Sequence, residues 1–308
     1  MKSLAGCAQR RFTLFFGLLA ALFSQSGQAI VGGIGVDANT AGSFWSGVVS
    51  ISIGGGVYSG VLLDNGYILT AAHVAASGVS NPGGLTVNFN AGSSLSQSIS
   101  AESVTVYSGY TGTKVGSDGF WHDDLALIKL SSAAPSSATG YSLYSGSSVT
   151  TNTTMTLVGY GGSASVKRVG QNKIDYLVAD DDGTTKTEIL LFDFDGSTNA
   201  TNVMGGGTLG ANVEAQYAGG DSGSPMFVQV NGQWQLIGIA SFNGTVKNSD
   251  GTPYSTSNTT FGSIGGATSV AAYSSWINTV SAVPEPQSYA MLLAGLGLLG
   301  LCVRRRSS

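Results

Sequence analysis

The sequence predicts an all-β protein with a single C-terminal helix. It contains 46 glycines, and only 10% of its 308 residues are charged. Such a composition favours short strands joined by polar turns. Short apolar runs separated by turn residues recur between residues 30 and 282, and only residues 269–280 have a plausible helical length and spacing. Many short strands with one helix indicate a β-barrel or β-sandwich architecture.

The first strands follow one another closely. Residues 47–53 alternate apolar and small side chains, as a half-buried strand does. Residues 61–63 and 67–69 flank the turn Asp64-Asn65-Gly66, which predicts a hairpin. Further strands are expected over these runs: residues 125–130, 155–158, 188–194, 226–230 and 236–240.

Two more local signals complete the chain. Asn231-Gly232 predicts a tight turn between the last two strands. In the expected helix, the apolar side chains share one side, at positions Val270, Tyr273, Trp276, Ile277 and Val280. No internal repeat is present, so residues 30–282 are expected to form one unit.

Residues 1–29 are expected to be a signal peptide. Three basic residues precede an apolar run of 12 residues, Phe12–Phe23, and small residues stand near Ala29. The run is too short to cross a bilayer, which disfavours a membrane anchor. Arg10-Arg11 is also compatible with export by the twin-arginine route.

The last 26 residues, 283–308, are expected to form a second targeting signal. A Val-Pro-Glu-Pro segment at 283–286 precedes a short apolar stretch, Tyr289–Val303, and three arginines follow. Arginines hold such an end on the cytoplasmic side. The arrangement resembles a PEP-CTERM sorting signal. That resemblance implies transient membrane anchoring and processing by an exosortase, and hence a final place at the bacterial cell envelope or outside the cell. A plain tail anchor is the alternative.

The remaining body is acidic. Between residues 30 and 282 there are seven basic and 16 acidic residues, a formal charge of about −9. This disfavours nucleic acid as a partner. The two cysteines, Cys7 and Cys302, lie in the terminal segments, so no disulfide is expected in the body.

Three short motifs carry residues suited to nucleophilic catalysis. His73 stands in TAAHV (70–74), Asp124 in DDLALIKL (123–130), and Ser222 between glycines in GGDSGSP (219–225). A serine nucleophile needs a base, a carboxylate that orients this base, and backbone N–H groups for the oxyanion. Asp123 is the alternative carboxylate, whereas His122 fits no motif and is expected to be structural or on the surface.

The order and flanks of these motifs resemble the trypsin/chymotrypsin family of serine proteases, over residues 30–277. The resemblance implies two six-stranded β-barrels of the chymotrypsin type. It also implies that His73 is the general base, Asp124 its partner and Ser222 the nucleophile, with Gly220 and Ser222 forming the oxyanion hole. It places the carboxylate directly before the Leu-Ala-Leu strand, which favours Asp124 over Asp123. A secreted endopeptidase acting on proteins or peptides is therefore expected, without a cofactor or metal.

The motif IVGG at residues 30–33 adds a further expectation. In the family, a new N-terminus of this kind folds inward and pairs with the aspartate before the nucleophile. Ile30 directly follows Ala29, so signal cleavage would itself create this N-terminus, and Asp221 would be its partner. Cleavage elsewhere remains the alternative.

The substrate pocket is less clear from the sequence. The resemblance implies that Gln216 lies at the pocket base, Ser241-Phe242-Asn243 along one wall and Gly265 on the opposite wall. Gln216 replaces the carboxylate that would select Arg or Lys. We therefore expect a neutral pocket for a medium-sized or polar side chain.

Two points stay open. The insertion from Asp180 to Val213 contains two acidic stretches, at 180–183 and 193–196, which could bind calcium but are better interpreted as solvated turns. The alternative to an active protease is a surface-displayed binding or adhesion protein that kept the fold and lost activity.

Overall fold

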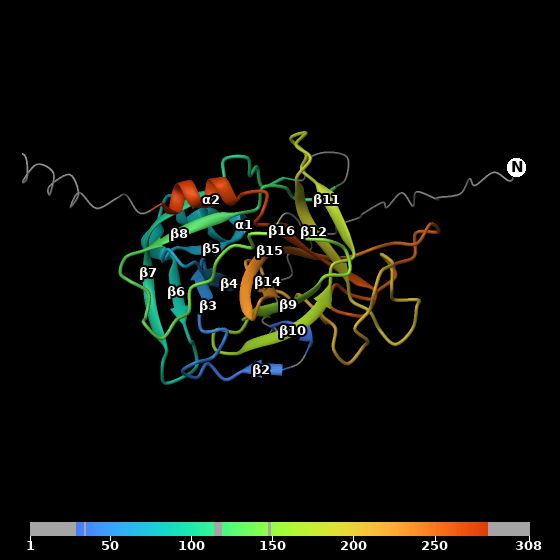
Figure 1. Ribbon diagram of the computed structural model, residues 1–308, viewed down its shortest axis with the longest axis horizontal. Coiled ribbons are helices and arrows are strands. Elements are labelled where there is room, and N and C mark those ends of the chain that lie inside the picture. Colours follow the sequence, from blue (N-terminus) through green and yellow to red (C-terminus); the bar gives the residue numbers. More distant parts are fainter. Residues whose placement is uncertain (1–28, 34, 114–118, 147–148, 283–308) are drawn as a thin grey trace, which may run out of the picture.

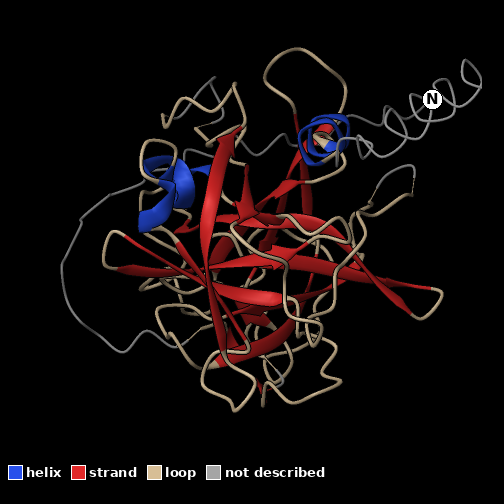
Figure 2. Cartoon of the chain, turned by 90° about the vertical axis from the view of Figure 1, so that its left-hand side faces the viewer, coloured by secondary structure: helices blue, strands red, loops and turns tan. Residues whose placement is uncertain are grey.

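The structure, a computed structural model, describes residues 29–33, 35–113, 119–146 and 149–282. Strands occupy its interior, and the short helical segments lie at the periphery (Figure 2). The all-β class with a C-terminal helix is confirmed, and of the two six-stranded barrels expected, one is present as a closed barrel while the other half is a larger eight-stranded sheet.

The first half forms a closed six-stranded barrel in the order β3-β4-β5-β8-β7-β6. Every neighbouring pair is antiparallel, and the last strand, β6, pairs back with β3. Each strand is therefore hydrogen-bonded on both sides. Closure leaves this sheet without an exposed edge. The strands are β3 Val48–Ile53, β4 Gly56–Leu62, β5 Ile68–Thr70, β6 Thr86–Phe89, β7 Gln97–Val106 and β8 Ala126–Leu130.

Seven strands of the second half and β2 from the N-terminal segment form an eight-stranded sheet in the order β11-β12-β16-β15-β14-β9-β10-β2. β10 and β12 also meet through the Asn172 side chain, whose Nδ2 donates to the carbonyl oxygens of Asp193 (2.7 Å) and Ala215 (3.0 Å). The strands are β2 Gly35–Asp37, β9 Thr154–Gly159, β10 Lys167–Lys173, β11 Tyr176–Ala179, β12 Thr187–Asp193, β14 Pro225–Val230, β15 Gln233–Thr245 and β16 Ser263–Ser269. A separate ladder pairs β1 (Val31–Gly32) with β13 (Ala215–Gln216).

The two halves lie side by side, with the barrel on the left of Figure 1 and the large sheet on the right. The C-terminal helix α2 (Ser274–Ser281) returns to the barrel and lies beside β8 (Figure 1). Tyr273 and Ile277 are buried in the barrel core. The other helical segments are short: α1 Ala72–Ala75, η1 Ala76–Gly78 and η2 Pro82–Gly84.

Two expectations need correction. The helix expected over 269–280 begins only at Ser274, because β16 extends to Ser269. The interpretation of residues 193–196 as a solvated turn is also wrong. Asp193 ends β12, and Asp193 and Asp195 are only 1% and 3% exposed. The Asp193 carboxylate accepts a hydrogen bond from the Met204 N–H (2.7 Å) and so helps to hold the inserted loop.

The expected signal peptide, apart from Ala29, and the sorting tail lie outside the described residues. No helix within the described ranges is long and apolar enough to cross a membrane. The short membrane segment expected in the tail therefore stays a prediction.

Candidate active site

His73 and Asp124 are positioned by neighbouring strands of the first barrel. β5 ends at Thr70, and the four-residue helix α1 then carries His73. Ala71 and Ala72 are fully buried, so the small side chains before the histidine allow this helix to pack closely. Asp124 comes two residues before β8, which pairs with β5. Strand pairing therefore brings the two motifs together.

The Asp124 carboxylate contacts the histidine twice. Its Oδ2 lies 2.7 Å from His73 Nδ1, and its Oδ1 accepts the His73 backbone N–H at 2.9 Å. Ser241 Oγ donates a further hydrogen bond to Oδ2 (2.5 Å). Asp124 is 1% exposed, whereas the His73 side chain is 33% exposed. The buried carboxylate thus fixes the ring by its Nδ1 side and leaves Nε2 for other partners.

The electrostatics of the pair favour protonation of the histidine. Burial alone lowers the pKa of His73, but the charge of Asp124 and its hydrogen bond outweigh burial and raise the pKa above its usual value. An imidazole of this kind can accept a proton and hold it as a stabilised imidazolium.

Asp123, the alternative carboxylate, lies elsewhere. Its Oδ1 lies 2.8 Å from Tyr273 Oη, and its backbone N–H donates to Glu188 Oε1 (2.7 Å). Its φ of 61° places this residue in the left-handed region, which turns the chain between adjacent aspartates. Burial and the charges of nearby carboxylates raise the pKa of Asp123 to about 6. The structure therefore brings Asp124, and not Asp123, to His73.

Ser222 lies in a turn that requires glycine on both sides. Gly220 and Gly223 have φ values of 90° and 82°. A Cβ on Gly220 would lie 2.4 Å from the backbone of Gly161, and one on Gly223 would lie 2.1 Å from Thr70 Oγ1. These turns therefore exclude larger side chains on steric grounds as well. The glycines allow the Ser222 loop to press against both halves of the molecule.

Asp221 anchors this loop from the inside. It is fully buried, and its carboxylate accepts N–H groups from Ile30 (2.8 Å), Gly161 (2.9 Å) and Ala218 (2.8 Å). Burial raises the pKa of Asp221 to about 6, although these hydrogen bonds oppose the shift. The expected pair of Ile30 and Asp221 is thus in contact.

Ile30 itself is strained. In the structure it is still joined to Ala29, so the group that donates to Asp221 is an amide. The Ile30 side chain is fully buried, and its φ is 30°. A positive φ is a genuine outlier for a β-branched residue. Cleavage of the bond before Ile30 would remove this restraint and give Asp221 an ammonium partner.

A cavity of about 460 Å³ joins these groups. His73, Asp124 and Ser222 all line it, together with Gly220. Its other walls are formed by Tyr110, Gly112, Trp121, Tyr217, Ala218, Gly219, Ala240, Ser241, Phe242, Asn243 and Asn258. The predicted triad residues and oxyanion-hole residues therefore face one common space.

The predicted substrate-binding residues divide into two groups. Ser241, Phe242 and Asn243 line the cavity, but Gln216 and Gly265 do not. Gln216 is fully buried, where its Nε2 donates to Ser263 Oγ (3.2 Å) and its Oε1 accepts the Tyr217 N–H (2.8 Å). A Cβ on Gly265 would lie 2.6 Å from Gln216 Oε1. These two residues therefore lie behind the pocket wall.

The Asn243 side chain makes hydrogen bonds along the cavity wall that the sequence did not indicate. Its Nδ2 donates to the carbonyl oxygen of Tyr217 (2.6 Å) and, more weakly, to that of Asn258 (3.4 Å). The contact joins β15 to the segment that leads to Ser222. The hydrogen bond from Ser241 Oγ to Asp124 was also missed, because a lone serine more than 100 positions away gives no local signal.

Comparison with known proteins identifies the family of the chain. The profile of the Trypsin family matches residues 33–277. The chain belongs to the trypsin family. Over 270 residues it is 27% identical to chymotrypsin-like elastase family member 1 of Bos taurus, covering 84% of this chain and 92% of that protein.

The tail has its own match. Residues 282–306 match the PEP-CTERM protein-sorting motif. This trypsin-family protein therefore carries an export and sorting signal for the cell envelope or the extracellular space.

The His73–Asp124 contact leads to a testable titration. We expect the NMR-detected pKa of His73 to lie above 6.5 and to fall when Asp124→Asn removes the charge that raises it. Because the pKa of His73 is higher in the folded than in the unfolded state, its protonation stabilises the fold. This stabilisation is complete at low pH and is lost as pH rises through the folded-state pKa. The body has two histidines, so His122→Gln assigns the signals. Asp123→Asn is the matched control, and an equal fall in that variant would contradict the pairing.

Proposed function

We propose that this protein is an exported serine endopeptidase that hydrolyses peptide bonds through an acyl-enzyme on Ser222. The observation that carries the proposal is the pair of His73 with the buried Asp124, which faces the same cavity as Ser222. Membership of the trypsin family supports the same reaction class. In this geometry, Asp124 holds the base His73 at Nδ1, and Ser222, which carries the hydroxyl group, lines the cavity that His73 faces.

In the proposed mechanism, Ser222 Oγ attacks the substrate carbonyl carbon while His73 Nε2 takes the hydroxyl proton. Asp124 holds Nδ1 and stabilises the imidazolium that forms. His73 then gives the proton to the leaving amine, and the C–N bond breaks to leave an ester on Ser222. Water, deprotonated by His73, attacks this ester and releases the acid, and the proton returns to Ser222.

The oxyanion would be received by the backbone N–H groups of Gly220 and Ser222. Within the described part of the chain, neither group donates a backbone hydrogen bond, and both residues line the cavity. Donors that are already oriented by the surrounding turn stabilise developing charge without reorganisation. The Asp221 contacts support this role because they hold the turn from behind.

We further propose that the chain divides into a signal peptide (1–29), a protease domain (30–282) and a sorting tail (283–308). Cleavage after Ala29 would turn the Ile30 amide into an ammonium 2.8 Å from the Asp221 carboxylate. A buried carboxylate gains much from a well-placed cation, and this pair would secure the oxyanion turn. The PEP-CTERM match supports an exosortase-type enzyme as the processing partner of the tail.

For specificity, we propose a neutral pocket that accepts small to medium side chains. Position 216 has Gln216 in place of a carboxylate that would attract Arg or Lys, and its side chain is buried behind the wall. The Asn243 amide bridges to Tyr217 and both residues line the cavity, so this bridge would narrow the space for a long side chain. A relative that matches the chain is named a chymotrypsin-like elastase, and elastases have a small pocket for the side chain of the cleaved residue.

The first prediction concerns the nucleophile. Ser222→Ala should lower kcat/KM for a peptide substrate by about 10⁴-fold or more, because it removes covalent catalysis. A fluorophosphonate probe should label the wild type and not this variant. Ser224→Ala is the matched control in the same turn. A folded, mature wild type that neither cleaves peptides nor reacts with the probe would favour the inactive binding protein instead.

The second prediction concerns activation. Mass spectrometry of the exported protein should give a chain beginning at Ile30. Purified protein with one extra N-terminal residue should have a kcat/KM at least tenfold lower, because the ammonium is then displaced from Asp221. Equal activity of the two forms would refute this activation step while leaving the protease assignment intact.

The third prediction concerns the pocket. Asn243→Gly removes the bridge to Tyr217, so the preference for Phe over Ala at the cleaved residue should rise at least tenfold in kcat/KM. Asn258→Ala keeps the carbonyl that Asn243 reaches and should leave this ratio unchanged. A peptide-library profile dominated by cleavage after Arg or Lys would refute the neutral pocket.

A further inference from the structure

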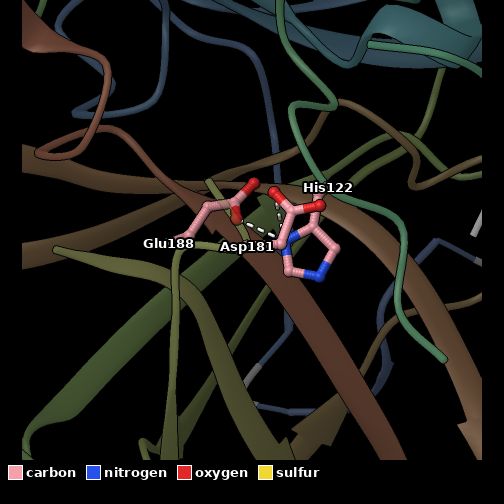
Figure 3. Close-up of side chains that lie close together, drawn as sticks. All are labelled: His122, Asp181 and Glu188. Atoms are coloured by element: carbon pink, nitrogen blue, oxygen red, sulfur yellow. Dashed lines mark hydrogen bonds and ion pairs between the residues drawn. The ribbon is translucent and has the colours of Figure 1, made fainter. Parts of the chain in front are cut away.

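A second cluster of polar side chains lies outside the cavity of the candidate active site. His122, Asp181 and Glu188 each offer one ligand atom, and these atoms lie within 4.8 Å of one another (Figure 3). None of the three residues lines the cavity around Ser222. The proposed protease mechanism does not use them.

The three donors come from separate segments that the fold brings together. His122 precedes β8, Glu188 is the second residue of β12, and Asp181 lies in the turn between β11 and β12. His122 Nδ1 contacts Glu188 Oε2 directly and lies 3.7 Å from Asp181 Oδ1. The imidazole and both carboxylates thus converge on one point, as Figure 3 shows.

Glu188 is oriented by groups outside the cluster. The carboxylate is fully buried, and its Oε1 accepts hydrogen bonds from the Asp123 N–H (2.7 Å) and from Tyr273 Oη. These bonds leave Oε2 directed at His122. Metal-binding carboxylates are commonly held in this way by a second layer of hydrogen bonds.

We propose that His122, Asp181 and Glu188 bind a divalent transition-metal ion of the zinc type. One imidazole nitrogen and two carboxylate oxygens form a ligand set suited to zinc, with water completing the tetrahedron. Metal–ligand bonds of about 2.0–2.2 Å place tetrahedral ligands about 3.3 Å apart, close to the 3.7 Å between His122 and Asp181. His122 and Glu188, which are in direct contact, would have to move apart to this spacing as the ion replaces the proton between them.

The burial pattern suits entry of an ion from solvent. The side chains of His122 and Glu188 are 1% and 0% exposed, whereas that of Asp181 is 20% exposed. A bound dication would compensate the two carboxylates inside the molecule, where unpaired charge is costly. Calcium is a poorer match because it prefers a shell of oxygen ligands.

Such an ion would tie the β11–β12 turn to the segment that carries Asp124. Glu188 already receives the N–H of Asp123, the residue directly before Asp124. The bound ion would therefore stabilise the backbone on which the His73 partner is mounted. This site does not depend on the proposed peptidase activity.

The test uses the mature chain carrying Ser222→Ala, which prevents self-digestion, after treatment with EDTA and dialysis. Calorimetric titration with ZnCl₂ should give one site, and zinc should raise Tm, because an ion that binds only the folded state stabilises it. Asp181→Asn should weaken zinc binding at least tenfold. Asp182→Asn, in the same turn, is the matched control and should bind like the parent. CaCl₂ should not substitute for ZnCl₂.

Two results would overturn the proposal. One is a folded parent protein that takes up no zinc, which would leave the cluster as an ion pair only. The other is unchanged zinc binding in both Asp181→Asn and His122→Gln, which would move the metal to another site such as His73–Asp124. Should His122→Gln fail to fold, the more exposed Asp181→Asn still decides between these outcomes.

Discussion

The buried carboxylate of Asp221 is the constraint on which the arrangement around Ser222 depends. Its partners come from three places: the N-terminal segment at Ile30, the loop after β9 at Gly161, and the nucleophile loop at Ala218. Because a carboxylate away from water must have partners, each of these segments has little freedom to move. The loop that carries the nucleophile is thus held from behind by this carboxylate, which does not line the cavity, in addition to its backbone hydrogen bonds to Ser59 and Ala240.

Much of the fold could be predicted because most strands carry a local signal. Apolar runs bounded by glycine and asparagine turns gave β3, β5, β8, β9, β12 and β14 within a residue or two. β7 escaped prediction since many of its side chains are polar and face outward, and β16 because small buried residues such as Gly265 and Gly266 carry no strong strand preference. The start of α2 could not be predicted, because tertiary pairing extends β16 through Ser269.

The candidate site, like the fold, could be predicted only in part from the sequence. His73, Asp124 and Ser222 lie in motifs that can be recognised one at a time, and the barrel then brings His73 to Asp124. Hydrogen bonds between residues far apart in the chain could not be predicted from the sequence. Ser241 contacts Asp124, which is 117 positions away, and Tyr273 contacts Glu188, which is 85 positions away. Such contacts depend on strand register, which no short window of residues contains.

The backbone at Ile30 suggests that cleavage before this residue would be an irreversible maturation step. While Ala29 is attached, a buried β-branched residue is held at a φ of 30°, and the group that Ile30 offers to Asp221 is an uncharged amide. If export cleaves this bond, relief of strain and gain of an ammonium occur together, and the broken peptide bond does not re-form. A precursor inside the cell would then be harmless to its own cytoplasm without a dedicated inhibitor, because the step that removes it from that compartment is also the step that completes it.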